Sequence, residues 1–375
     1  MNKRIHLSLA SMGGHEQEFI NQAFNTNWIA PLGPNVDGFE NDLKVYLSEE
    51  KCVVALITGT AALHIGLIML DVRCGDEVIC QSFTFSASAN PIKYLGAKPI
   101  FIDSEFDTWN MSPQLLEEAI LDRKKKTGKF PKAIILVHLY GMPAKINEII
   151  AISQKYKIPI LEDAAEALGS TFYGQKCGTF GEFGILSFNG NKIITTSGGG
   201  ALICRTNEIA NRIKFFASQA RDDAPHNQHS HIGYNYRMSN ICAGIGRGQM
   251  LVLEEHIARR REIHALYSEL FRNVDGITVK QNPFSNINSN FWLTCILIDR
   301  KIFRKTREDI RIKLESENIE SRPLWKPMHL QPVFSDTIFY LNGVSEILFD
   351  KGLSLPSGPA LTNEEVERVV KTILT

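Results

Sequence analysis

The stretch FGILSFNGNKIITTSGGGAL, residues 183–202, decides how the rest of the sequence is interpreted. An apolar run typical of a core strand, Gly184 to Phe188, precedes a loop with one lysine, Lys192, and three glycines that no stable helix would hold. A second apolar run, in residues 160–167 (ILEDAAEA), leads into Asp163. Because ligands in open α/β sheets bind at the carboxyl ends of the strands, we expect Asp163 and Lys192 to share one cleft.

Short apolar runs alternate with helical patterns over the first two thirds of the chain. The alternation predicts an α/β fold with a mostly parallel seven-stranded sheet sandwiched by helices. The expected strands are residues 51–57, 77–80, 99–102, 133–137, 158–161, 185–188 and 200–204. We assign residues 1–245 to this large domain.

The pattern changes after residue 240. Residues 241–270 read as one long helix with a charged face formed by Glu254, Glu255, Arg259, Arg260, Arg261 and Glu262. Beyond it the clearest strand is residues 291–298, with helices near 303–317 and 363–374. Residues 246–375 are therefore expected to form a smaller α+β domain.

Composition excludes several classes of protein. The 375 residues include 41 basic and 41 acidic side chains, so the chain lacks the excess of positive charge that is typical of nucleic-acid-binding proteins. No apolar run is long enough to cross a bilayer, and we expect no membrane association. The seven cysteines are scattered and odd in number, which is typical of small core residues in a reducing compartment. These features predict a cytoplasmic protein.

Lys192 is the candidate covalent residue. A partly desolvated lysine can be neutral and form a Schiff base, although an isolated lysine is more often a solvated surface residue. Asp163 favours the covalent reading, because pyridoxal phosphate (PLP) needs a carboxylate at its pyridine nitrogen; alone, it would more often cap a helix. The turn at Thr60 and Ala61 precedes a helix, and the free N–H groups of a helix start could bind a phosphate. Many βα turns have the same pattern, so this signal alone is weak. With Phe85 for ring stacking, the set predicts a PLP site.

Competing motifs are absent or weak. Five residues separate Gly184 from Gly190, and Asn191 precedes Lys192, so the stretch is not a Walker A loop. No Gly-x-Gly-x-x-Gly opens a helix after the first strand, which removes the Rossmann fingerprint. The histidines at 226, 229 and 231 lie in a polar segment without a supporting cysteine or acid, so we predict a solvated loop and no metal site.

Three ordered motifs carry a resemblance to the sugar-nucleotide aminotransferases of the DegT/DnrJ/EryC1/StrS family. They are EDAAEALG at 162–169, SF-x-x-x-K at 187–192 with its trailing glycines, and GYNYRMS at 233–239. The resemblance covers essentially the whole chain and implies the fold of a fold-type I PLP aminotransferase. Residues 187–196, 27–33 and 322–329 most resemble the C4 aminotransferases of the UDP-N,N′-diacetylbacillosamine route.

The resemblance also implies roles for individual residues. Lys192 would form the Schiff base and move protons, Asp163 would pair with the pyridine nitrogen, and Phe85 would cover one ring face. Thr60, Ala61 and Ser187 would hold the phosphate, with Asn235 reaching across from the second subunit of a homodimer with shared active sites. Glu166 takes the position on the other ring face, where many relatives have Gln or His. The nucleotide-sugar pocket would be lined by Asn27, Trp28, Ile29, Ala30, Arg322, Trp325, Met328 and His329.

The expected reaction transfers an amino group from glutamate to C4 of UDP-4-keto-6-deoxy-N-acetylglucosamine, giving the 4-amino-4,6-dideoxy sugar for bacillosamine-type glycan synthesis. One alternative is a GDP- or dTDP-linked keto-sugar, as in GDP-perosamine formation. A second is a sugar dehydratase of the same family, which Lys192 argues against because those enzymes carry histidine there. A third is a non-catalytic PLP-fold binding protein, whose signature would be a lost lysine or aspartate, or an added DNA-binding domain.

Overall fold

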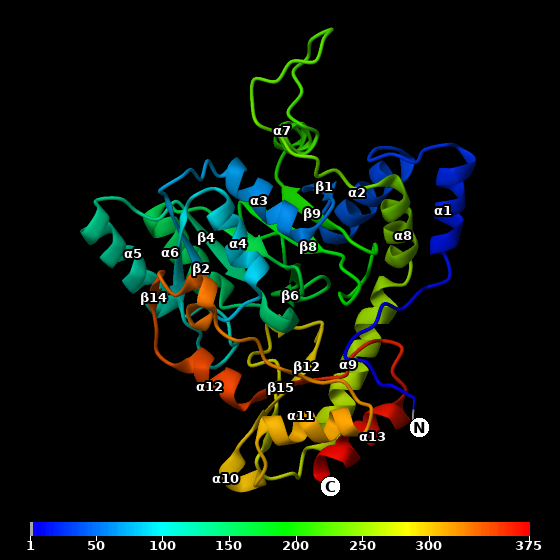
Figure 1. Ribbon diagram of the computed structural model, residues 1–375, viewed down its shortest axis with the longest axis vertical. Coiled ribbons are helices and arrows are strands. Elements are labelled where there is room, and N and C mark those ends of the chain that lie inside the picture. The colour runs from blue at the N-terminus through cyan, green and yellow to red at the C-terminus, as the bar shows by residue number, and fades with distance from the viewer. Residues whose placement is uncertain (1–2) are drawn as a thin grey trace.

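The computed structural model describes residues 3–375 and places one large sheet between layers of helices (Figure 1). Its strands lie in the order β1-β9-β8-β5-β4-β2-β3-β14. They are β1 (Cys52–Leu56), β2 (Glu77–Gln81), β3 (Lys98–Ile102), β4 (Ala133–Val137), β5 (Ile160–Asp163), β8 (Phe183–Ser187), β9 (Gly200–Cys204) and β14 (Ile338–Tyr340). Strand β9 pairs antiparallel with β1 and β8, whereas the other pairs in this sheet are parallel. The predicted mostly parallel α/β sheet is confirmed.

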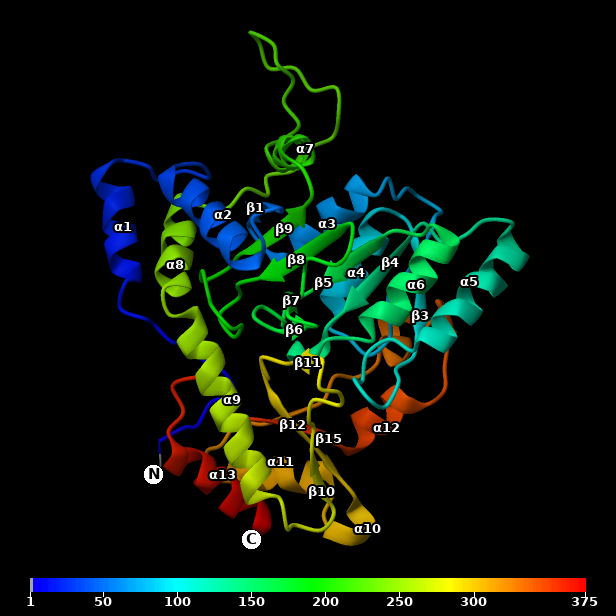
Figure 2. The same cartoon turned by 180° about the vertical axis from the view of Figure 1, so that it is seen from behind.

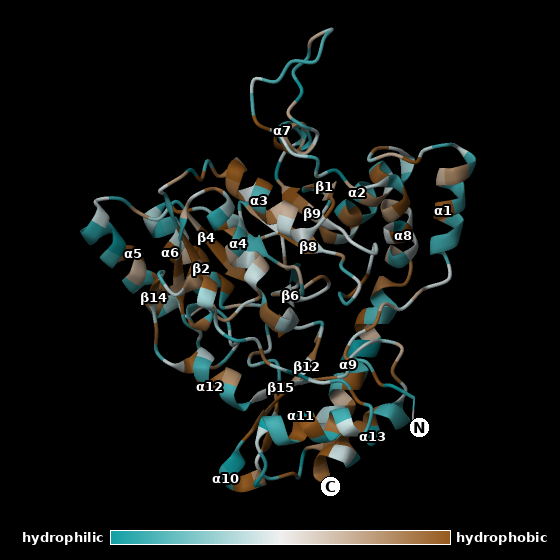
Figure 3. Ribbon diagram, in the orientation of Figure 1, coloured by the Kyte–Doolittle hydropathy of each residue, from teal (hydrophilic) through white to brown (hydrophobic). Residues whose placement is uncertain are grey.

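Alternate residues of each strand face opposite helix layers, as the period of two requires. In β1, Val54 and Leu56 pack with the layer of α3 (Gly59–Met69), α4 (Ser86–Tyr94) and α7 (Asn207–Ala217), whereas Val53 and Ala55 face α2 (Pro34–Leu47). The outer helices α5 (Pro113–Thr127) and α6 (Ile146–Tyr156) cover β2 to β5 on the second face. Figure 3 shows hydrophobic strands beside a largely hydrophilic α5.

The sheet has one strand more than the seven predicted. The eighth, β14, comes from the C-terminal part of the chain and pairs parallel with β3, with Ile338 opposite Ile100. It is anchored by two short 3₁₀ turns, η2 (Met328–Leu330) and η3 (Pro332–Phe334), and the Phe334 ring packs edge-on against Phe101 at 5.2 Å. A three-residue strand has too little periodicity to be recognised in a sequence.

A second core lies below the large sheet in Figure 1. The antiparallel sheet there has the order β10-β12-β15-β13, and α9 and α13 pack on it. Its elements are α9 (Leu253–Leu270), β10 (Ile277–Val279), β12 (Thr294–Ile298), α10 (Arg300–Phe303), α11 (Arg307–Ser316), β13 (Arg322–Pro323), α12 (Val344–Lys351), β15 (Gly352–Leu355) and α13 (Asn363–Leu374). A small sheet of β11 (Ile287–Asn288), β6 (Thr171–Phe172) and β7 (Gln175–Lys176) joins the two regions.

The N-terminal segment also belongs to this second core. Ile5 is buried there and bridges to Ile319, and the Ser357 N–H donates to the Leu7 carbonyl before the chain rises to α1 (Glu16–Asn25). The domain boundary between residues 245 and 246 stays a prediction, and residues 1 and 2 lie outside the described part of the chain.

The single helix predicted over residues 241–270 is wrong. Two residues, Leu251 and Val252, separate helix α8 (Asn240–Met250) from α9, which begins at Leu253. Gly248 of α8 lies directly against Glu16 of α1, where an added Cβ would come within 2.6 Å of the backbone nitrogen, while α9 packs on the other core. Tertiary contacts therefore set the break. The charged face expected on this helix is also partly wrong, because the Arg260 side chain is fully buried.

A polar loop between α7 and α8 stands away from the rest of the molecule (Figure 2). Within it the Asp222 carboxylate accepts from Ser230 Oγ at 2.7 Å and Gln228 Nε2 at 3.2 Å. The three histidines of this loop are exposed. Over residues 3–375, no helix has both the length and the apolar character needed to span a membrane.

Candidate active site

A cavity of about 300 Å³ opens at the carboxyl ends of β1, β2, β5 and β8. This is the edge where the sequence placed the cleft. Seven of the predicted site residues line it: Thr60, Phe85, Asp163, Glu166, Ser187, Lys192 and Trp325. Residues that follow separate strands are therefore brought together here, as expected from the parallel sheet.

The turn between β1 and α3 presents backbone donors to this cavity. Thr58 caps α3, and its hydroxyl oxygen accepts the Ala61 N–H at 2.9 Å. The N–H groups of Gly59 and Thr60 open the helix, and within residues 3–375 neither has a hydrogen-bond acceptor. Gly200 packs so closely that an added Cβ would lie 2.4 Å from the Gly59 nitrogen. Two free N–H groups at the positive end of a helix form a site for an anion.

Asp163 ends β5 with its carboxylate buried beside the cavity. Its Oδ2 accepts from Ser88 Oγ at 2.7 Å, and Oδ1 accepts the Ala165 N–H at 3.2 Å. The Thr84 hydroxyl lies 2.8 Å from Ser88 and extends the network. Burial raises the pKa of Asp163, against the opposing effects of these hydrogen bonds and of the Lys192 charge. A cationic partner in the cavity would favour the ionised carboxylate.

Lys192 projects into the same cavity from the loop after β8. Its Nζ lies 3.2 Å from Glu166 Oε1 and 4.2 Å from the centre of the Trp292 ring. The side chain is 13% exposed, so the amine is partly desolvated. This environment is the one that the covalent interpretation of Lys192 requires, and it differs from that of a solvated surface lysine.

Glu166 is a buried carboxyl between Lys192 and the backbone of Tyr140. Its Oε2 accepts the Tyr140 N–H at 2.7 Å, which the left-handed conformation of Tyr140 (φ 54°) directs inward. Burial raises the pKa of Glu166 to about 7, even though the Lys192 charge and the Tyr140 N–H lower it. A carboxyl with this pKa is partly protonated at neutral pH.

Aromatic rings form one wall of the cavity. Phe85 lies 5.3 Å from Trp325 between ring centres, and Tyr140 lies 5.2 Å from Trp325 and 6.3 Å from Trp292. The Tyr140 hydroxyl accepts the Trp325 N–H at 3.0 Å. Phe85 is 55% exposed although it borders the cavity, so its outer face remains available for contact.

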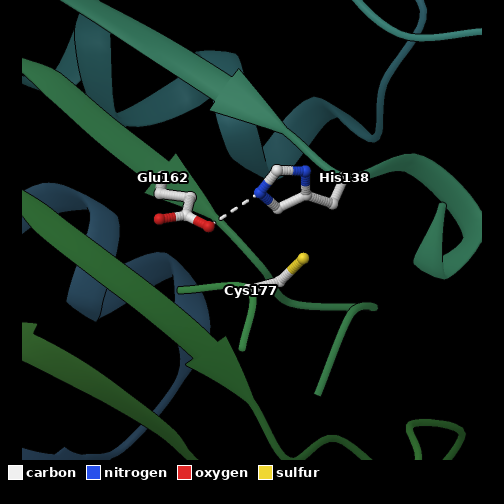
Figure 4. A group of neighbouring side chains, drawn as sticks. All are labelled: His138, Glu162 and Cys177. Carbon is white, nitrogen blue, oxygen red and sulfur yellow. Dashed lines mark hydrogen bonds and ion pairs between the residues drawn. The ribbon is translucent and has the colours of Figure 1, made fainter. Parts of the chain in front are cut away.

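A separate group of His138, Glu162 and Cys177 lies buried beneath the site (Figure 4). His138 Nε2 is 2.8 Å from Glu162 Oε1, and His138 Nδ1 accepts the Ala144 N–H, so the ring donates to Glu162. Burial alone would raise the pKa of Glu162, but His138 and the N–H groups of Gly178 and Gly181 more than offset it, and the pKa is lowered. With its oxygens already hydrogen-bonded, Glu162 holds strands together and is a poor ligand for a cation.

The remaining predicted residues lie outside the cavity lining. Asn235 is exposed beside the projecting loop and forms a bridge with Ser218. Of the residues 27–30, Trp28 is 40% exposed and Ile29 is 51% exposed, and Asn240 of α8 donates its side-chain amide to the Trp28 carbonyl at 3.0 Å. Their roles toward a second subunit or a nucleotide stay predictions.

The C-terminal segment divides between the cavity and other sites. Trp325 reaches the cavity, whereas Arg322 is exposed and donates to the Glu320 carboxylate. Met328 is buried in the core of the large sheet. His329 lies next to it, with Nδ1 2.6 Å from Ser82 Oγ and Nε2 3.2 Å from Glu346. A substrate role for these three residues also stays a prediction.

Sequence reasoning missed Ser88, Tyr140 and Trp292. Ser88 follows Phe85 by three positions in the helix after β2, and that spacing places both on one helix face. Trp292 and Tyr140 had no such signal, because both come to the site through contacts between distant segments.

The geometry fits PLP. A buried carboxylate, a partly desolvated lysine, two free N–H groups at a helix start and an aromatic side wall meet in one cavity. These four groups would suit the pyridine nitrogen, the aldehyde, the phosphate and the ring of PLP, respectively. The cavity thus has the lining of a PLP-dependent enzyme.

The chain belongs to the DegT/DnrJ/EryC1/StrS aminotransferase family, whose model matches residues 10–374. It is 49% identical to EpsN of Bacillus subtilis (strain 168), provisionally described as a pyridoxal phosphate-dependent aminotransferase, over 100% of this chain and 96% of that protein. It is 35% identical to GDP-perosamine synthase of Escherichia coli O157:H7, covering 99% of this chain and 98% of the relative.

Solved structures agree with this assignment. An aminotransferase of the same family from Brucella abortus superimposes with a TM-score of 0.88 at 30% identity, covering 96% of this chain and 94% of that one. A protein from Streptococcus pneumoniae, provisionally described as a sugar aminotransferase and solved in a PLP form, has a TM-score of 0.90 at 25% identity, with 99% and 98% covered. The chain is thus a PLP-dependent sugar aminotransferase, as the sequence predicted.

Proposed function

We propose that this enzyme transfers an amino group from glutamate to C4 of UDP-4-keto-6-deoxy-N-acetylglucosamine. The observation that carries the proposal is the single cavity in which the Lys192 amine, the Asp163 carboxylate and the start of α3 meet. The choice of a UDP-sugar rests on the sequence of residues 187–196 and on a 32% identical UDP-2-acetamido-2-deoxy-3-oxo-D-glucuronate aminotransferase of Pseudomonas aeruginosa. It covers 90% of this chain and 89% of that relative.

Each residue has a defined task in this proposal. PLP, when bound, supplies an electron sink next to the carbon that gains or loses nitrogen. Asp163 would hold the pyridine nitrogen in its protonated form, and Thr60 and Ser187 would hold the phosphate. Ala61, also predicted for the phosphate, lies outside the cavity lining and donates its N–H to the Thr58 hydroxyl. Lys192 would form the covalent bond to the cofactor and then move a proton at the reacting carbon.

Glu166 would set the protonation of Lys192. Its Oε1 lies 3.2 Å from Nζ, and its pKa near 7 allows it to take the proton that the amine must lose before it can attack a carbonyl. Phe85 and Trp325 would exclude water from one side of the cavity. The reaction would then proceed in two half-reactions: glutamate gives up its amino group in the first, and the keto-sugar receives an amino group in the second.

We also propose a homodimer in which Asn235 of each subunit completes the site of the other. The exposed Asn235 and the neighbouring Ile232, which is 83% exposed, support this arrangement. A cytoplasmic location is proposed from the seven cysteines, all free thiols.

The test is the visible absorbance of the PLP-loaded protein on mixing with UDP-4-amino-4,6-dideoxy-N-acetylglucosamine, which runs the reaction in reverse. Loss of the cofactor band with this sugar, and not with GDP-perosamine or a dTDP-linked amino sugar, is the expected result. The GDP-perosamine synthase relative makes the GDP-sugar the second candidate. Bleaching by GDP-perosamine alone would replace the proposed UDP-linked keto-sugar with a GDP-linked keto-sugar as the substrate.

The catalytic assignment has its own test. Lys192→Ala should fold and lose transamination, because no other amine lines the cavity among residues 3–375. Retained transaminase activity in that variant would overturn the role of Lys192.

A further inference from the structure

Arg260 of α9 is a fully buried guanidinium beside the active-site loop. Its side chain is 0% exposed, and no carboxylate within residues 3–375 is close enough to form an ion pair with it. Burial lowers the pKa of Arg260 to about 9. A buried cation without a counter-ion is costly, so its partners need an explanation.

The partners of Arg260 are backbone carbonyls around Lys192. Its Nη1 donates to the carbonyls of Trp292 at 2.8 Å and Ser357 at 2.9 Å. Its Nη2 reaches Ser8 Oγ at 3.1 Å and the carbonyl of Lys192 itself at 3.4 Å. Helix α9 runs from the large sheet to the second core (Figure 1), and its Arg260 side chain ties the lysine loop to the segments of Ser8, Trp292 and Ser357.

The carbonyl of the preceding residue is held in the same way. Asn191 O accepts from Ser8 Oγ at 3.0 Å and from the indole Nε1 of Trp292 at 2.7 Å. Arg260 thus fixes the Lys192 backbone and also the Trp292 backbone, while the Trp292 ring lies 4.2 Å from Lys192 Nζ. Arg260 therefore holds the Lys192 backbone directly, and it holds the backbone of Trp292, whose ring contacts the Lys192 amine.

We propose that Arg260 is a positioning residue that fixes the Lys192 loop and Trp292 through their backbone carbonyls. This inference rests on the proposed covalent role of Lys192. A neutral side chain of similar length would fill the space without the cost of a buried charge, and a lysine would keep the charge without the fork of donors.

The experiment compares Arg260→Met, Arg260→Lys and a matched control, Arg259→Met. Arg259 is the preceding residue of α9 and also donates to a backbone carbonyl, that of Leu361 at 2.6 Å, but it lies away from the cavity. The first readout is the rate of Lys192 acetylation by acetic anhydride at a fixed pH in the cofactor-free protein, followed on its tryptic peptide. The second is the rate at which glutamate bleaches the PLP-loaded protein, with the half-saturating glutamate concentration.

For Arg260→Met we expect the Lys192 acetylation rate to rise about threefold, because the freed loop opens to the reagent more often. The bleaching rate should fall about tenfold with half-saturation unchanged, because the lysine is less well placed. Arg260→Lys should change both rates in the same direction, because a lysine lacks the fork of donors that holds the carbonyls. Arg259→Met should match wild type in both readouts. A melting temperature reports any general loss of stability.

An Arg260→Met variant with the acetylation rate and the bleaching rate of Arg259→Met would overturn the proposal. If Arg260→Met does not fold, Arg260→Lys decides, and an unchanged bleaching rate in that variant refutes the positioning role. Failure of the proposed function is seen separately, because borohydride would then attach no cofactor to Lys192 in the wild-type protein, whereas the acetylation rates need no cofactor.

Discussion

Replacing either of two buried glutamates near the end of β5, Glu162 or Glu166, by glutamine should change the stability of the protein in opposite directions. Glu166 has a pKa raised to about 7 from its ordinary 4.5, whereas the pKa of Glu162 is lowered. A carboxyl that binds its proton more tightly when folded costs stability as pH rises through the interval between the two values. At about 1.4 kcal/mol per pKa unit, the interval of about 2.5 units for Glu166 corresponds to roughly 3 kcal/mol above pH 7.

Glu166→Gln removes this penalty in the cofactor-free protein. Most of the effect, about 2.5 kcal/mol, should develop between pH 5 and pH 8. The variant should therefore gain stability on wild type over this range. Glu162→Gln should lose stability at pH 8, on the order of 3 kcal/mol, since a carboxylate paired with His138 and three backbone N–H groups is removed. Because the pKa of Glu162 lies below its ordinary 4.5, that loss should persist from pH 8 to pH 5 and shrink only at lower pH.

Urea unfolding followed by tryptophan fluorescence at pH 5, 6.5 and 8 measures both variants against wild type. The opposite signs make each glutamate the control for the other, because both are buried and lie four residues apart. The reasoning fails if Glu166→Gln is no more stable relative to wild type at pH 8 than at pH 5, or if both variants change in the same direction.

Three further predictions concern the cavity and its surroundings. Asp163→Asn should lower the rate of transamination by about a hundredfold or more at saturating PLP, measured by the bleaching assay; a rate near wild type would remove the carboxylate from catalysis. Asn235→Trp should weaken PLP retention in equilibrium dialysis, and unchanged affinity would argue against the cross-subunit role. Gly200→Ala should cost about 2 kcal/mol in urea unfolding, because the new Cβ meets the Gly59 nitrogen at 2.4 Å. Gly190→Ala, whose Cβ meets nothing within 4 Å, should cost far less.

The sequence was informative where function follows strand order. Thr60, Asp163 and Lys192 each follow a core strand, and a mostly parallel sheet brings such positions to one edge. Their convergence could therefore be predicted before the structure was known. The substrate segment was less predictable, because Trp325 reaches the cavity while Arg322, close by in the chain, points to Glu320 on another surface.

Long-range packing accounts for what the sequence did not predict. The helical period runs through Leu251 and Val252, yet α8 packs on α1 and α2 while α9 packs on the second core, and the two helices are separate. Arg260 has the pattern of a solvated helix residue, yet the second core closes over it with carbonyls from distant segments. A periodicity records which face is apolar, but it carries no information about an arginine whose partners are backbone atoms.

The central claim is that Lys192 carries the cofactor, and borohydride reduction of the PLP-loaded protein tests it most directly. Mass analysis of the digested protein should find one phosphopyridoxyl group per chain, on the peptide that contains Lys192. A label on another lysine, or no label at saturating PLP, would contradict the account.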